Sequence, residues 1–212
     1  MKNIEIPIRF RTILPYLRGN ILDLSIECLS YLKINNNKIL YDYLDKDIDY
    51  YGIDINKEII FKHKTKGRNV KQCNLLNENI PFSEKFDCCV LIETLEHLFN
   101  PIDTLKKCYG VLKKGGIVIG SVPNVVCMSS FIYDNYFFNN KIEYKIKQPY
   151  NCGHWHVNSF DVSTLSFALR CSGFKIKIIK KFGCNIKKFG INLPENKLFN
   201  IFATYILFVG EK

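Results

Sequence analysis

Short apolar runs alternate with segments of helical periodicity along this 212-residue chain. Alternation of this kind is typical of βαβ units and predicts an α/β domain with a mostly parallel sheet. Only a loop joins the last two predicted strands, so one of them is expected to run antiparallel to its neighbours. The apolar runs predict strands at 20–24, 50–55, 69–74, 86–92, 116–122, 174–181 and 201–210, and the periodic segments predict helices near 28–33, 57–65, 101–112 and 162–171.

Two of these predicted elements have clear boundary signals. The helix at 162–171 follows Ser159 and Asp161, which are suitable N-caps, and ends before Gly173, a good residue for the position after a helix. The run 113–116, Lys-Lys-Gly-Gly, predicts a tight turn from a helix into the fifth strand.

Two segments interrupt the alternation. Residues 35–46 are polar and separate the first helix from the second strand, and residues 125–158 are rich in aromatic side chains. The aromatic segment follows the fifth strand at its carboxyl end, where α/β sheets bind ligands. We therefore expect one domain over 1–212, with 125–158 as a lid or insertion on the substrate side.

Polar residues at strand ends are candidates for the shared crevice of a parallel sheet. Asp54 ends the second strand, where an acid can accept both hydroxyls of a ribose, and it could also cap the next helix. Asn74 ends the third strand and could meet an adenine edge or merely close a turn. We include the residues that follow them, Ile55 and Leu75, in the same expected site.

The stretch ETLEHLFNP after the fourth strand places Glu93, Glu96 and His97 within about one helical turn. Glu93 could be a pocket acid and His97 a proton acceptor, because the pKa of histidine lies near neutrality. Both acids could also simply occupy the start of a helix, where the helix dipole favours them. For Glu96 we favour this second interpretation.

A second histidine-rich stretch, NCGHWHVNSF, contains Cys152, His154 and His156. His-x-His occurs in metal sites, but no second ligand cluster stands at a convincing spacing. We therefore expect no metal, and a histidine pair that either faces the substrate or has a structural role.

Charge and cysteine content narrow the class of protein. The net charge of +10 invites a nucleic-acid interpretation, but the lysines are spread along the chain, so nucleic acid is an unlikely partner. The nine cysteines include no CxxC pair and several lie within apolar runs, which favours a reduced, cytoplasmic protein. No apolar segment is long enough for a membrane span or a signal peptide.

Several segments, in order, resemble the class I S-adenosylmethionine-dependent methyltransferases, in particular the methyltransferase type 11 or UbiG-like group. The similar segments are YYGIDINKEII, IPFSEKFDCCVLIETLEHLFNP, LKKCYGVLKKGGIVIGSVPN and GHWHVNSFDVSTLSFALRCSGFKI. The resemblance implies a Rossmann-like, seven-stranded sheet with its last strand antiparallel and helices on both faces. It also implies S-adenosyl-L-methionine as the cofactor.

Carried over by residue, the resemblance assigns roles around the cofactor. Asp54 would bind the ribose hydroxyls, and Asn74 falls where the family usually has an acid near the adenine amino group. The backbone after Asp23, including Ser25 and Glu27, would approach the methionine part. Glu93 would lie at the entrance to the reacting centre, and His97, His154 or His156 could act as a base.

The first family motif departs from its usual form. The family typically has LDLGCGxG, whereas this chain has LDLSIECL, so side chains stand where bare backbone should lie against the cofactor. Two functions follow as hypotheses. The chain is either an active methyltransferase for a small-molecule, lipid or glycan-precursor acceptor, or a methyltransferase-like protein with weakened cofactor binding that acts as a partner or regulatory subunit. A homodimer is compatible with either hypothesis.

Overall fold

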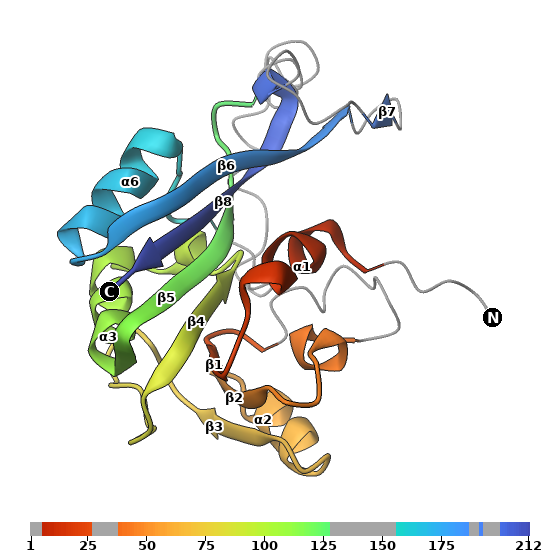
Figure 1. The fold of residues 1–212 in the computed structure, drawn as a ribbon, viewed down its shortest axis with the longest axis vertical. Coiled ribbons are helices and arrows are strands. Elements are labelled where there is room, and N and C mark those ends of the chain that lie inside the picture. The colour runs from red at the N-terminus through yellow and green to blue at the C-terminus, as the bar shows by residue number, and fades with distance from the viewer. Residues whose placement is uncertain (1–5, 27–37, 128–155, 187–190, 193–199) are drawn as a thin grey trace.

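A single twisted sheet organises the chain (Figure 1). The structure, a computed structural model, describes residues 6–26, 38–127, 156–186, 191–192 and 200–212. The strands lie in the order β3-β2-β1-β4-β5-β8-β6-β7. Their bounds are β1 (Asn20–Asp23), β2 (Asp49–Asp54), β3 (Asn69–Gln72), β4 (Phe86–Ile92), β5 (Leu112–Pro123), β6 (Lys175–Ile186), β7 (Ile191–Asn192) and β8 (Ala203–Glu211).

The pairing confirms the predicted topology. Strands β3, β2, β1, β4 and β5 are all parallel, and β8 runs antiparallel to both of its neighbours, β5 and β6. The seven predicted strands therefore form a mixed Rossmann-like sheet whose last strand is antiparallel. The structure adds β7, a two-residue strand that pairs with the far end of β6 and that the apolar pattern did not predict.

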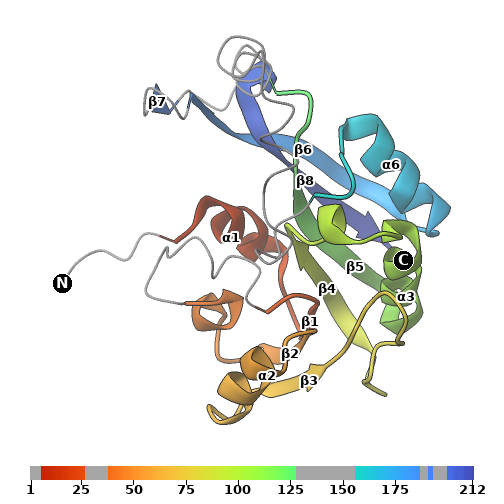
Figure 2. The same cartoon turned by 180° about the vertical axis from the view of Figure 1, so that it is seen from behind.

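The helices of the described residues lie along both faces of the sheet. They are α1 (Ile8–Ile13), α2 (Lys57–Lys64), α3 (Pro101–Val111) and α6 (Val162–Cys171), with 3₁₀ turns η1 (Leu14–Tyr16), η4 (Leu40–Tyr43), η5 (Leu95–His97) and η9 (Asn200–Phe202). Figures 1 and 2 show α3 and α6 together on one side and α1 on the other. No helix among these described segments is long and apolar enough to cross a membrane.

Strand β4 shows why the sheet is covered on both faces. Its side chains alternate between two cores: Cys89 and Leu91 pack with α3 and α6, whereas Cys88, Val90 and Ile92 pack with α1. All five are buried. Because every residue of β4 from Cys88 to Ile92 is apolar, this part of the strand needs cover on both faces, which explains the apolar run in the sequence.

The helix boundaries follow local signals. Asp161 caps α6 in a reciprocal pair with Thr164, and Gly173 follows the helix with a φ of 93°. Helix α1 was not predicted, because it has only six residues and a proline in the next turn stops it. Turn η4 lies within the polar segment 35–46, and the helix predicted near 28–33 lies outside the described residues.

Candidate functional site

The turn after β1 is built without glycine. Ser25 is half-buried, and Ile26 is buried against β2, where Gly52 makes room for it. A Cβ added at Gly52 would lie 2.9 Å from Cγ1 of Ile26. The bulky side chain at this point of the turn therefore points into a hydrophobic core, and Glu27 lies outside the described residues. The other buried members of that core are Ile39, Tyr50, Ile60 and Val70.

Asp23 ends β1 with a buried carboxylate. Its Oδ1 accepts a hydrogen bond from the backbone N–H of Ser25 (3.2 Å), and its Oδ2 accepts one from the hydroxyl of Tyr50 (3.0 Å). Burial raises the pKa of Asp23 from 3.8 to about 6; these hydrogen bonds oppose the rise, and the negative charge of Asp54 adds to it. A positive charge placed here would stabilise the ionised form.

Asp54 ends β2 at the same edge of the sheet. Its Oδ1 accepts from the backbone N–H of Asn56 (2.9 Å), and Asn56 is itself the N-cap of α2 through a bond from Glu58 N–H (2.8 Å). The alternative that Asp54 caps the helix is therefore wrong, because the cap lies two residues later. Ile55 is exposed, and its carbonyl oxygen accepts from Nε2 of Gln72 at the end of β3 (3.1 Å).

Asn74 lies two residues beyond the end of β3 and closes a turn, as one of its two predicted roles required. Its Oδ1 accepts from the N–H of Leu76 (3.1 Å), and its own N–H donates to Oε2 of Glu78 (2.7 Å). The next residue, Leu75, is buried, and its carbonyl oxygen accepts from Nζ of Lys107 on α3 (2.6 Å). The loop after β3 is therefore attached to the helix layer.

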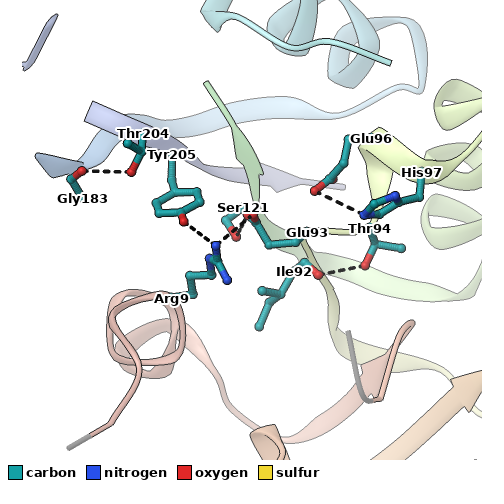
Figure 3. A network of polar contacts seen from close by, with 10 residues as sticks. All are labelled: Arg9, Ile92, Glu93, Thr94, Glu96, His97, Ser121, Gly183, Thr204 and Tyr205. Carbon is teal, nitrogen blue, oxygen red and sulfur yellow. Dashed lines mark hydrogen bonds and ion pairs between the residues drawn. The ribbon is translucent and has the colours of Figure 1, made fainter. Parts of the chain in front are cut away.

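Glu93 follows β4 and has the only positive φ (48°) among the described non-glycine residues. Its side chain is buried and accepts from the hydroxyl of Ser121 on β5 (2.8 Å), and its backbone N–H donates to the carbonyl oxygen of the same serine (2.9 Å). Its Oε2 lies 3.5 Å from Nη2 of Arg9 (Figure 3). The unusual backbone conformation thus directs this carboxylate toward α1 and β5.

Arg9 is a site residue that the sequence analysis missed. It lies on α1 beside Phe10 and Ile13, which bury the helix against the sheet. Besides Glu93, its guanidinium bonds the hydroxyl of Tyr205 on β8 and lies 4.2 Å from the centre of that ring. The only sequence signal was an arginine within an apolar helical face, which does not identify a distant partner.

Glu96 lies in η5 and is 1% exposed. Among the described residues, neither of its carboxylate oxygens has a hydrogen-bond partner. Burial, together with the negative charge of Glu93, raises its pKa well above the usual range for glutamate. Glu96 does lie in the first turn of a helix, as favoured, but η5 is a three-residue 3₁₀ turn without a side-chain cap, and the carboxylate of Glu96 is buried.

The structure brings His97 and His156 to this carboxylate. Nε2 of His97 lies 3.9 Å from Oε1 of Glu96, and the two imidazole rings meet edge to face with centres 4.9 Å apart. Cys152 and His154, the other members of the histidine-rich stretch, lie outside the described residues. Two of the three histidines expected as possible bases thus lie side by side.

Comparison with known proteins agrees with this architecture. Residues 36–120 match the family profile described as a methyltransferase domain, and no curated protein matches the chain. Two similar structures are S-adenosylmethionine-dependent methyltransferases from Archaeoglobus fulgidus and Methanosarcina mazei, each with 19% identity and a TM-score of 0.64. The first match covers 96% of this chain and 91% of the other, and the second covers 98% of both.

A third similar structure is the magnesium protoporphyrin IX methyltransferase of Synechocystis with bound S-adenosylhomocysteine, at 10% identity and a TM-score of 0.61, covering 96% of this chain and 81% of that one. Residues 36–120 are thus similar to a methyltransferase domain, and the chain has the same Rossmann-like fold as these S-adenosylmethionine-dependent methyltransferases.

Proposed function

We propose that the chain is an active methyltransferase that uses S-adenosyl-L-methionine and acts on a small-molecule, lipid or glycan-precursor acceptor. The observation that carries this proposal is the burial of Ile26 against Gly52. Because this side chain packs into the core, the turn after β1 keeps its bulkiest described residue away from the crevice. Ile26 stands at the cysteine position of the family motif, and of the residues that replace the motif's glycines the structure describes only Ser25, whose side chain is small.

The carboxylates at the ends of β1 and β2 suit the cofactor. A carboxylate at the end of β2, as in Asp54, can accept from both hydroxyls of a ribose. The buried carboxylate of Asp23 lies where a cationic amino acid group would favour its ionised form. S-adenosylmethionine supplies an electrophilic methyl group and carries positive charge, so both acids have a chemical reason to lie here.

The task of the protein in such a transfer is positional. It must align the acceptor atom with the methyl group and exclude water, which requires fixed groups around the reacting centre. Arg9 and Ser121 hold Glu93 in this way beside the end of β4. If the acceptor keeps a proton at neutral pH, we assign its removal to one of the expected bases, His97, His154 or His156.

One observation favours the second hypothesis, a protein with weakened cofactor binding. The carboxylate of Glu93, expected at the entrance to the reacting centre, is bound by groups of its own chain on α1 and β5. If this closed arrangement persists in solution, Glu93 contributes nothing to a ligand. Cofactor binding therefore decides between an enzyme and a partner or regulatory subunit.

The test is calorimetric titration with S-adenosylmethionine and S-adenosylhomocysteine. We expect micromolar binding, and the substitution Asp54→Ala should weaken it about tenfold or more, which corresponds to about 1.4 kcal/mol. Asp47→Ala, an exposed acid just before β2, is the matched control and should leave the affinity unchanged. An Asp54→Ala protein that binds as tightly as the parent would show that the ribose role is misplaced.

A further inference from the structure

We propose that Glu96, His97 and His156 bind one divalent transition-metal ion beside the carboxyl end of β4. One potential ligand atom from each residue lies within 4.8 Å of the others. Ligands bound at about 2.1 Å from a common ion are about 3.4 Å apart in a tetrahedral site and up to about 4.2 Å apart at most. Side-chain adjustments of about an ångström would therefore complete the site.

The state of Glu96 is an independent observation that points to a cation. Both of its oxygens are buried without a hydrogen-bond partner among the described residues. Leaving a carboxylate in this condition is costly, and buried charges are ordinarily paired or coordinate metals. The 3.9 Å between Oε1 and Nε2 of His97 is too long for a hydrogen bond, so the neighbouring ring does not satisfy the carboxylate directly.

The backbone holds these side chains together although they are distant in the sequence. The carbonyl oxygen of Glu96 accepts from the N–H groups of Val157 (2.8 Å) and Asn158 (3.0 Å). The side-chain amide of Asn158 also donates to the carbonyl oxygen of Leu98. These bonds attach the chain after His156 to η5, so the three potential ligands come from two segments that are fixed to each other.

The ligand chemistry indicates the type of ion. Two imidazole nitrogens and one carboxylate oxygen suit Zn²⁺, Co²⁺, Mn²⁺ or Fe²⁺ better than Ca²⁺ or Mg²⁺, which prefer oxygen ligands alone. Three protein ligands leave coordination positions open, as in sites that bind a further molecule. In an extension that rests on the proposed function, an open position would hold an oxygen or nitrogen atom of the methyl acceptor.

Cobalt titration of the full chain tests the site, because Co²⁺ reports its ligands by absorption. Tag-free protein is first freed of metal with a chelator. We expect one Co²⁺ per chain, visible d–d bands, and no near-ultraviolet charge-transfer band of the kind that a cysteine thiolate would give. Zn²⁺ should displace the cobalt, because it suits the same ligands.

Matched variants assign the ligands. Glu96→Gln and His156→Gln should each weaken Co²⁺ binding about tenfold or more, whereas Glu84→Gln, an exposed acid before β4, should not change it. Glu96→Gln resembles the protonated acid and adds no charge to the core, and its fold can be checked by circular dichroism. Unchanged binding in Glu96→Gln, a thiolate band, or no saturation at millimolar Co²⁺ would each overturn the proposal.

A parallel titration with S-adenosylhomocysteine in the presence of a chelator separates the two proposals. The cofactor residues assigned above do not include the proposed ligands, so cofactor binding should survive metal removal. Metal binding without cofactor binding would contradict only the proposed function, and the reverse result would contradict only the metal site.

Discussion

The buried carboxylate of Asp23 makes the stability of the protein depend on pH in a predictable direction. Its pKa is about 6 in the folded chain, against an ordinary 3.8, because burial disfavours the charged form. The folded state therefore keeps a proton that the unfolded state has already released, and stability falls as pH rises from about 4 through 6. At about 1.4 kcal/mol for each pKa unit, the loss at neutral pH is about 3 kcal/mol.

The substitution Asp23→Asn removes this ionisation and keeps a side chain that can accept the bond from Ser25. We expect its advantage in unfolding free energy over the parent to grow by roughly 2.4 kcal/mol between pH 4 and pH 7.5. Urea unfolding at a series of pH values measures it, with Asp47→Asn as the exposed control. A difference between Asp23→Asn and the parent that stays constant across this range would refute the reasoning.

Three further predictions follow from buried groups. In metal-free buffer at neutral pH, Glu96→Gln should raise the unfolding free energy by about 1 kcal/mol or more. The pKa of Glu96 is raised by folding, so at any pH above its ordinary pKa of 4.5 this acid destabilises the folded state, and glutamine removes that cost. An unfolding free energy of the variant below that of the parent would contradict this. Arg9→Leu should cost about 3 kcal/mol in urea unfolding by removing the positive charge beside the buried carboxylate of Glu93, and adding Glu93→Gln should recover part of it, whereas purely additive losses would argue against coupling. Gly120→Ala should cost about 3 kcal/mol or more because its Cβ would overlap a carbonyl oxygen of β4, while Gly110→Ala, with open space on α3, should gain about 0.5 kcal/mol; equal thermal midpoints would contradict this contrast.

Local signals account for the part of the fold that could be predicted. Helix α6 begins and ends where expected, because Asp161 and Gly173 determine its two ends through contacts within a few residues. The mostly parallel sheet followed from the alternation of strands and helices, and an antiparallel strand near the end of the chain followed from the loop between the last two strands. The turn at Asn74 could also be predicted from local sequence, because its side chain bonds the backbone N–H of Leu76, two residues further on.

The candidate site depended on contacts that no local pattern encodes. The pairing of Arg9 with Glu93 exists because the sheet places α1 over the ends of β4 and β5. Likewise, Glu96 and His156 meet only because backbone hydrogen bonds join η5 to the chain before α6. The members of each pair lie far apart in the sequence, so a search for clusters of neighbouring ligand residues could not find them.

The most direct test of the account is the calorimetric titration of the full chain with S-adenosylhomocysteine. We predict a single saturable site with a dissociation constant in the micromolar range, about −8 kcal/mol of binding free energy. No detectable binding at millimolar ligand would contradict the claim that this glycine-free turn still admits its cofactor, and would favour a partner or regulatory role.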